Sequence, residues 1–543
     1  MENLRFILAI SLALVASMLW QAWEQDYGTP APAQAAATAP QQVVTTQVPA
    51  APTAQSLAPA EISVTADADR RVEVTTDVLR VVINTTGAGI SRAELLRFPV
   101  RMDEPDVPLL LLDDAPANLH VIQGGLLAGD RGPTHEAVFT AAQQSFALEA
   151  EQDSLTVPLK WSSGAVNVTK EYVFTHGSYE IKVRYRVENG DAAPWVGRSY
   201  TQIQRVDPQH GAARLIYTYT GAVISSPDQR YEKVEFDDMR ETPLKRDISN
   251  GWLAMLQHYF VTAVIPARTD VPYQYYTSDF KDNRFAVGLI SPPVEIAAGA
   301  EGLLEERLYV GPKLQELLER TAEGLDLTVD YGSLWFLAKP LFICLVWLHE
   351  LTGNWGWSII LVTVLLKILF YQLSAAGYRS MANMRRVQPR LKAIQERYKE
   401  DRTRLNQAMM QIYKEEKINP FGGCLPILIQ IPVFIALYWV LLESVEMRQA
   451  PFILWIRDLS SPDPYWVLPL VMGVTMFVQQ KLNPAPMDPV QEKVMQIMPF
   501  AFTIFFGFFP AGLVLYWVAN NILSIAQQWL ITRNIERGAK APG

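Results

Sequence analysis

Hydrophobic and polar residues follow two different patterns along this chain. Between residues 61 and 330, short runs alternate apolar and polar side chains, as in Glu180–Val187, and Gly, Pro, Asn and Asp separate the runs. Period-two alternation is typical of β-strands that bury one face. Further runs of this kind cover Val72–Val74, Leu79–Ile83, Val166–Phe174, Leu215–Tyr219, Leu253–Val264, Phe285–Ile290 and Glu305–Val310. We therefore predict that residues 61–330 form a large all-β sandwich.

The chain from residue 353 onward carries apolar segments of helical length instead. Five of them are candidate membrane spans: residues 355–373, 424–442, 466–478, 494–509 and 512–531. A bilayer core of about 30 Å needs about 20 helical residues, so the third and fourth segments are short and would thin the bilayer around them. We predict a five-helix membrane core over residues 353–543.

The N-terminus carries a further apolar run, from Phe6 to Trp20. No small-residue cleavage site separates this run from Trp23. We therefore predict an uncleaved transmembrane anchor over residues 1–25, with a cleaved secretory signal as the alternative. Residues 26–60 are mostly Ala, Pro, Thr and Gln. Such a segment has too little apolar surface to fold and is predicted to be a flexible linker.

Charge sets the predicted topology. Segment 374–421 holds 11 Lys and Arg residues, and positively charged loops favour the cytoplasmic side of a membrane. If five spans follow an exported sandwich, this segment lies in the cytoplasm, and we predict that it forms a helical hairpin. Counting 334–348 as another span would invert every later loop, so residues 331–352 are predicted to form an interfacial amphipathic helix. The side chains expected to enter the lipid are Trp335, Phe336, Trp347 and Leu348. In the hairpin, we expect Met384, Leu391 and Ile394 to face Leu405, Met409 and Ile412.

Composition narrows the classes of function. The net charge is −9, and no uniformly basic surface is present for nucleic acid. The only cysteines, Cys344 and Cys424, cannot form a disulfide framework or a thiolate metal cluster, and the six histidines are scattered. We therefore predict no catalytic residues, no metal and no cofactor, and a function without covalent catalysis.

The most informative polar residue is Lys367, twelve residues into the segment 355–373. A lysine at the centre of a span costs about 2.5–3.5 kcal/mol on insertion scales, and no acidic residue lies at the same predicted depth. Thr363 lies one turn earlier on the same helix face. Because a charged lysine without an acidic partner needs water, we predict a hydrated cavity beside Lys367 that opens toward the cytoplasm.

Other spans supply polar groups that could line this cavity. The predicted lining consists of Lys367, Thr363, Gln430, Trp517, Asn520, Ser524 and Thr503. In the last span Trp517, Asn520, Ser524 and Gln527 share one helical stripe. Ordinary helix packing is the alternative role for such groups, and it is the stronger one for Thr503 and Ser524.

Several specific stretches resemble the YidC-type membrane protein insertases of Gram-negative bacteria, which are relatives of the mitochondrial and chloroplast insertases. The similarity extends over essentially the whole chain. The stretches are Lys339-Pro340-Leu341, Gly353-Asn354-Trp355-Gly356, Asn419-Pro420-Phe421-Gly422-Gly423-Cys424, Arg448-Gln449-Ala450-Pro451-Phe452 and Pro510-Ala511-Gly512-Leu513-Val514-Leu515-Tyr516-Trp517.

This resemblance implies a hydrophilic groove that is open to the cytoplasm and lipid and carries one positive residue. That position falls on Lys367, where most members carry arginine. Lysine keeps the positive charge but lacks the planar guanidinium of arginine, which can form two parallel hydrogen bonds to one carboxylate. The resemblance also implies a sugar-binding-type β-sandwich in the periplasm. Its implied partners are nascent membrane proteins, the Sec translocon and the lipid bilayer, with no sequence-specific nucleic acid; the ribosome is a candidate partner of residues 374–421 and of the C-terminal tail.

We therefore expect an inner-membrane insertase and chaperone with both termini in the cytoplasm and residues 26–350 in the periplasm. One alternative is a channel or solute transporter with an exported receptor domain, which would need a continuous polar path. Another is an anchored, sugar-active exported enzyme. Deletion of residues 61–310 would distinguish the insertase from the exported enzyme. An insertase would still support growth after this deletion, whereas the enzyme would lose its function completely.

Overall fold

The computed structural model describes residues 70–208, 218–280, 282–398, 401–416, 425–483 and 489–540. The predicted anchor (1–25) and linker (26–60) lie outside these residues. The described chain forms two compact units, one ending at Val329 and the other beginning at Asp330.

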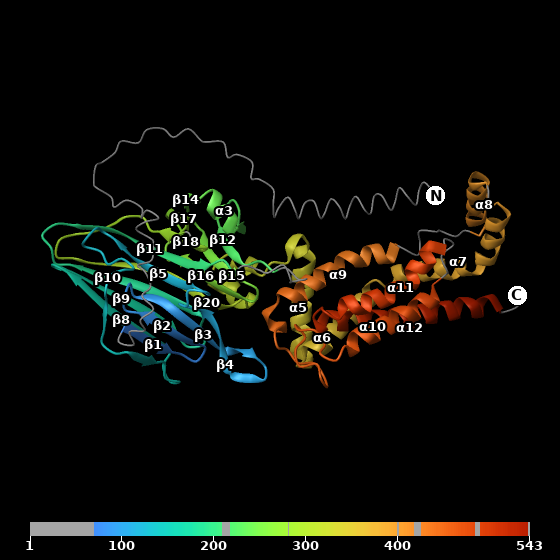
Figure 1. Cartoon of the computed structure of the whole chain (residues 1–543), viewed down its shortest axis with the longest axis horizontal. Helices are drawn as coiled ribbons and strands as arrows, with labels where there is room; N and C mark the ends of the chain where they lie inside the picture. The colour runs from blue at the N-terminus through green and yellow to red at the C-terminus, as the bar shows by residue number, and fades with distance from the viewer. Residues whose placement is uncertain are drawn as a thin grey trace. The chain divides into compact units, whose positions relative to one another are not determined.

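The first unit contains two large, almost wholly antiparallel sheets (Figure 1). The first sheet has the order β14-β17-β18-β11-β5-β3-β2-β1-β7, with β4 beside β3 and β19 beside β11. Its strands are β1 (Arg71–Thr75), β2 (Leu79–Asn84), β3 (Gly89–Arg101), β4 (Glu104–Leu112), β5 (His120–Leu127), β7 (Ser145–Ala147), β11 (Trp195–Val206), β14 (Lys245–Ile248), β17 (Tyr273–Asp279), β18 (Arg284–Ile290) and β19 (Val294–Ile296).

The second sheet has the order β13-β12-β15-β16-β20-β10-β9-β8-β6. Its strands are β6 (Thr140–Ala141), β8 (Ser154–Ser163), β9 (Val166–Thr175), β10 (Glu180–Asn189), β12 (Gly221–Ser225), β13 (Glu232–Val234), β15 (Trp252–Gln257), β16 (Phe260–Pro266) and β20 (Glu301–Pro312). Hydrogen bonds from Ser199 and Thr201 of β11 to Glu306 of β20 join the inner faces of the two sheets. The predicted β-sandwich is therefore confirmed.

Strand β10 shows why the alternating pattern was informative. Ile181, Val183, Tyr185 and Val187 are buried, and the residues between them are at least partly exposed. The prediction of one strand over Leu253–Val264 is wrong, because the chain turns at residues 258 and 259 and forms the β15–β16 hairpin. Both strands of this hairpin are buried on both faces, so no alternation marks the turn.

The predicted run Leu215–Tyr219 also differs from the structure. Its first three residues lie outside the described chain, and Tyr219 precedes β12 without belonging to a strand. The short helices α3 (Phe236–Glu241) and α4 (Gln315–Thr321) complete the regular elements of this unit together with a 3-10 turn at Leu325–Thr328.

The second unit is helical. Its α-helices are α5 (Trp335–Thr352), α6 (Trp355–Leu369), α7 (Tyr371–Arg397), α8 (Arg402–Glu415), α9 (Leu425–Glu443), α10 (Val467–Leu482), α11 (Pro489–Phe506) and α12 (Ala511–Lys540). The predicted spans 424–442, 466–478, 494–509 and 512–531 each coincide largely with one helix, and α10, α11 and α12 extend beyond the predicted apolar limits.

The predicted continuous helix over 355–373 is wrong. Helix α6 ends at Leu369, and α7 begins two residues later after a bend of 70°. No Gly or Pro stands at the break, so the sequence held no signal for it. Helix α7 then continues without interruption into the predicted hairpin, where Val387, Leu391 and Ile412 form a small buried core with α8. Met384, Ile394 and Met409 pack against that core, whereas Leu405 is not among its residues.

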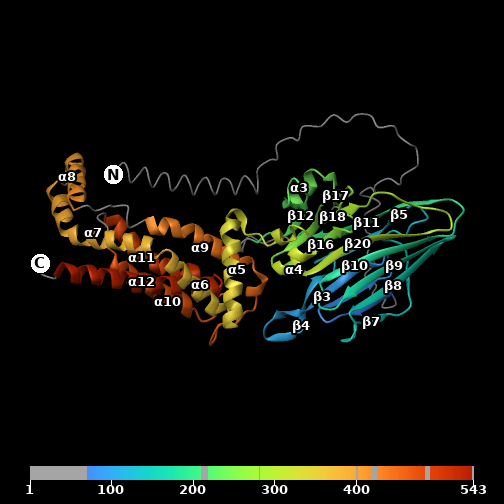
Figure 2. The same ribbon diagram turned by 180° about the vertical axis from the view of Figure 1, so that it is seen from behind.

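Helix α5 lies across the long axes of α9, α10 and α12 (Figure 2). Trp335, Phe336 and Trp347 are more than half exposed, as expected for side chains that could contact lipid. The expectation for Leu348 is wrong, because Leu348 lies on the buried face of α5 together with Leu345. By length and composition, the segment Gly332–Thr352 is itself apolar enough to cross a membrane, as is the α6–α7 pair if it forms one span.

Candidate functional site

A local cap and a close contact fix the start of α6. The Asn354 side chain accepts a hydrogen bond from the Trp357 backbone N–H at 3.2 Å, and its amide donates to the backbone carbonyls of Pro451 and Phe452. Gly356 lies against the Phe452 ring, where a Cβ atom would come within 2.0 Å. These contacts hold the helix that carries Thr363 and Lys367 against the loop after α9.

Lys367 points into the helical unit and contacts α12. Its ammonium donates a hydrogen bond to the Ser524 hydroxyl at 2.8 Å, and this hydroxyl donates to the Asn520 backbone carbonyl at 2.7 Å. Thr363 is buried on the same face of α6, and its hydroxyl bonds to the Ile359 carbonyl of its own helix. Thus α6 and α12 are linked through one charge-assisted hydrogen bond.

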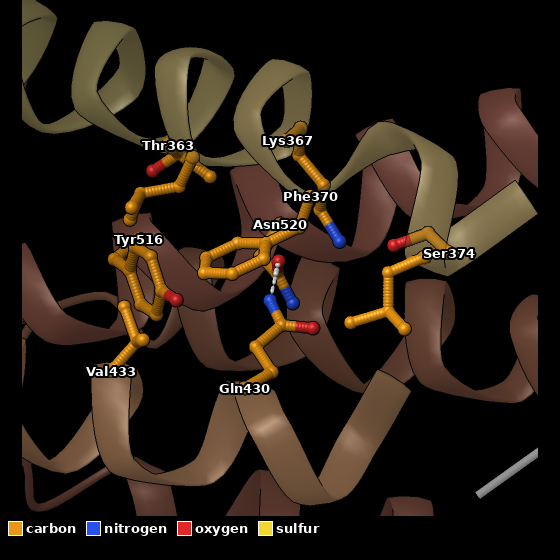
Figure 3. A pocket seen from close by; sticks show the side chains of 10 residues that line it. Thr363, Lys367, Phe370, Ser374, Gln430, Val433, Tyr516 and Asn520 are labelled. Carbon is orange, nitrogen blue, oxygen red and sulfur yellow. Dashed lines mark hydrogen bonds between the residues drawn. The ribbon is translucent and has the colours of Figure 1, made fainter. Parts of the chain in front are cut away.

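Asn520 also links α12 to α9. The Gln430 side-chain amide donates to the Asn520 side-chain carbonyl at 2.6 Å, as Figure 3 shows. In the same view, Lys367 and Ser374 border the pocket from α6 and α7. The structure therefore brings Lys367, Thr363, Gln430, Asn520 and Ser524 together from three helices, as predicted.

Two adjoining cavities surround these groups. The one beside Lys367 has a volume of about 10 Å³, which is room for roughly one water molecule. It is lined by Thr363, Leu366, Lys367, Phe370, Leu373, Ser374, Gln430, Val433, Tyr516 and Asn520. The second cavity has a volume of about 420 Å³ and shares Ser374, Gln430, Tyr516 and Asn520 with the first. Residues of α7, α9, α10, α11 and α12 line it.

The electrostatics of this pair of cavities are one-sided. Among the described residues that line them, Lys367 is the only charged one and no Asp or Glu occurs. Glu443 is buried at the opposite end of α9 from Gln430. The ammonium is half-buried next to hydroxyl and amide groups, and none of the described lining residues supplies a carboxylate to pair with it.

The two remaining predicted lining residues, Trp517 and Thr503, differ in position. Trp517 lines the larger cavity and packs edge-on against Phe434, with ring centroids 4.6 Å apart. Thr503 does not line either cavity: its hydroxyl bonds to the Pro499 carbonyl, and the residue packs against Gly473. The inclusion of Thr503 is therefore wrong, because its helix face is turned toward α10.

Other lining residues were missed. Tyr516 lies one turn before Asn520, so an extended helical stripe could have indicated it. Ser374 and Phe370 follow the bend after α6, which the sequence did not reveal. Across the described residues, no group of three His, Cys, Asp or Glu side chains is arranged to hold a metal ion.

An all-β unit joined to an apolar helical unit with a polar pocket is the architecture expected of a helical membrane protein with a large folded domain. The model of the 60Kd inner membrane protein family matches residues 347–538, and that of the YidC periplasmic domain matches residues 71–344. The chain belongs to the YidC family of membrane protein insertases. The prediction of an inner-membrane insertase with a periplasmic domain is thus confirmed.

Two relatives of similar length agree with this assignment. The membrane protein insertase YidC of Thioalkalivibrio sulfidiphilus is 49% identical over 99% of this chain and 100% of its own length. That of Nitrosococcus oceani is 48% identical with the same coverage. A crystal structure of an active YidC insertase with its first transmembrane domain resolved covers 84% of this chain and 92% of its own, at 18% identity and a TM-score of 0.39.

Proposed function

We propose that the Lys367 pocket receives the polar or acidic flank of a nascent membrane protein during insertion. The observation that carries the proposal is a half-buried ammonium whose hydrogen-bond partner is the neutral Ser524 hydroxyl. A carboxylate that entered the pocket would exchange this partner for an ion pair. The pocket would thereby offset part of the free energy needed to move a charged flank out of water.

The rest of the proposed route uses the helices around the pocket. The α7–α8 hairpin meets the client at the cytoplasmic side, the flank enters beside Lys367, and the apolar segment leaves into lipid along α9 and α10. Transfer of apolar surface out of water drives the last step. A membrane potential adds about 2.3 kcal/mol per acidic charge for each 100 mV.

The topology proposed for this route has an N-terminal anchor, five core spans and both termini in the cytoplasm, with residues 26–350 in the periplasm. The Lys and Arg residues of segment 374–421 support it through the positive-inside rule. Helix α5 is then interfacial, which its crosswise course and its exposed aromatic residues support. Lipid, the Sec translocon and a ribosome at the hairpin or the C-terminal tail are the proposed partners.

The proposal is tested by reversing the charge at Lys367 in purified protein reconstituted into vesicles. We expect Lys367→Glu to reduce insertion of a small client with an acidic flank by at least about tenfold, because a repulsive contact replaces an attractive one. Lys367→Arg should retain insertion, since it keeps the positive potential. Protease protection of the translocated flank measures the yield.

The matched control is Lys481→Glu, which makes the same charge reversal on α10 outside the lining of both cavities. This variant should insert the client within about twofold of the unchanged protein. Equal yields from the Lys367→Glu and Lys481→Glu variants would refute the electrostatic role.

A further inference from the structure

We infer that the larger cavity is a binding site for the apolar side chains that follow the client's polar flank, and that its methionines set how wide a range of clients it accepts. This inference rests on the proposed function of the Lys367 pocket, because the two cavities share part of their lining. A flank held at Lys367 places the next part of the client in the larger cavity. We call this cavity the methionine cup.

Four methionines from three helices line the cup. Met381 comes from α7, Met476 from α10, and Met495 and Met498 from α11. Methionine is unbranched, has three rotatable bonds and a polarizable sulfur, and so adapts to ligands of different shape. Methionine-rich surfaces that repack in this way are a known basis of promiscuous peptide binding.

The rest of the cup favours a peptide over an ion or a lipid headgroup. None of the described residues in its lining is charged, and six of them are amides: Gln430, Gln479, Gln480, Asn483, Asn520 and Asn521. Neutral amides can donate to and accept from a peptide backbone, whereas a phosphate would require a cation or several N–H donors. The volume of about 420 Å³ falls in the range of sites that enclose a drug-sized ligand, equivalent to a few side chains.

Gln480 supplies a second indication. Its side-chain carbonyl oxygen is buried and has no hydrogen-bond partner within the described part of the chain. A buried acceptor without a partner is unfavourable, because it has lost its hydrogen bond to water. A rotation of the Gln480 side chain toward the cup would bring this oxygen to a backbone N–H of the client, a contact that does not depend on the client's side chains. Side chains would thus be bound by methionines and backbone by amides, which suits a site for many different clients.

The first experiment replaces three methionines by a stiffer residue of similar volume. In the variant with Met476→Leu, Met495→Leu and Met498→Leu, the cup keeps its apolar character but loses much of its adaptability. Two clients share one acidic flank and differ in the next apolar residues, which are aliphatic in one and aromatic in the other. We expect the ratio of aromatic to aliphatic insertion to fall at least about fivefold.

The control is Met472→Leu, one turn earlier on α10, where the side chain is fully buried away from the cup. This control should change the client ratio by less than about twofold. An unchanged ratio in the triple variant, or an equal fall for both clients, would overturn the inference. Neither result would affect the proposed function, which depends on the separate outcome of Lys367→Glu.

A second experiment locates the client directly. A photoreactive residue at position 495 should form adducts with the apolar segment of a stalled client, because Met495 lines the cup. The same residue at position 343 should give much weaker client adducts, since Ile343 is 59% exposed on α5, away from the proposed exit along α9 and α10, and lies outside the lining. Equal adduct yields at the two positions would contradict a specific cup.

Discussion

Each of the two units holds a lysine in its interior, and the two lysines have different surroundings. Lys170 in β9 is 2% exposed, lies over the rings of Tyr172 and Tyr185, and donates a hydrogen bond to the Gly124 carbonyl at 3.4 Å. The fully buried Glu306 lies close enough to favour its charge. Lys367 in α6 instead borders a cavity whose described lining contains no carboxylate.

Burial shifts the pKa values of both Lys170 and Glu306 in the sandwich. It lowers the pKa of Lys170 to about 7, and Glu306 partly opposes this change. Burial also raises the pKa of Glu306, while the hydroxyls of Thr201 and Ser199 and the charge of Lys170 act in the opposite direction. The comparison indicates a structural role for Lys170, whose counter-charge lies in the same unit, and it supports the proposed binding of a client carboxylate at Lys367.

The largest effect expected in the sandwich comes from Glu306→Ala. This change leaves Lys170 without its buried counter-charge and removes the acceptor of the Ser199 and Thr201 hydroxyls. Loss of one partner of a buried pair reduces the free energy of unfolding by about 3–5 kcal/mol. Pulse proteolysis of the full chain in urea, read from sandwich fragments, measures this change.

The control for this variant is the next residue toward the N-terminus on the same strand. Glu305 pairs with Arg184 at the surface, at 3.0 Å, so Glu305→Ala should lower the free energy of unfolding by only about 0–1 kcal/mol. Insertion by the Lys367 pocket should persist in both variants, because the pocket lies in the other unit. Equal destabilisation by the two variants would contradict the structural role of Glu306.

The pH dependence of the sandwich should reveal Lys170 itself. Between pH 7 and pH 10.5 the unfolded chain holds a proton on Lys170 and the folded chain has released it, so stability from this group rises with pH. The slope should reach at most about 1.4 kcal/mol per pH unit. Glu306 acts in the opposite sense, because its raised pKa makes stability fall as the pH rises above 4.5.

In Lys170→Met the rise with pH above 7 should be absent. Urea unfolding at a series of fixed pH values, followed by the same proteolysis method, measures it. A rise of the same slope in Lys170→Met and in the unchanged protein would mean that other groups cause it.

The smallest effect is expected at Ser524. In Ser524→Ala the Lys367 ammonium loses a neutral partner that competes with the client carboxylate, so insertion of an acidic-flank client should increase by no more than about threefold. Insertion of a client with a neutral flank should not change. Thr503→Ala, which removes a hydroxyl outside the cavities, is the control. A loss as large as that of Lys367→Glu would mean that Ser524 holds the pocket together.

Local patterns predicted much of this molecule because they report on burial directly. The alternation in β10 predicted a half-buried strand, and the apolar run of α9 predicted a helix with nearly the observed limits. Spacing along α12 placed Trp517, Asn520, Ser524 and Gln527 on one stripe. The first three line the larger cavity, whereas Gln527 lines neither cavity. The β15–β16 turn escaped prediction because strands buried on both faces carry no alternation.

The sequence by itself determined which residue types are available: a lysine deep in an apolar segment, hydroxyls and amides at helical spacing, and methionines scattered over three helices. Only the tertiary structure decided which of them meet, because a hydrogen bond such as that between Gln430 and Asn520 joins residues 90 positions apart. It also decided the bend after Leu369 and the position of Thr503 outside the cavities. These features depend on packing between helices, which leaves no periodic signal along one chain segment.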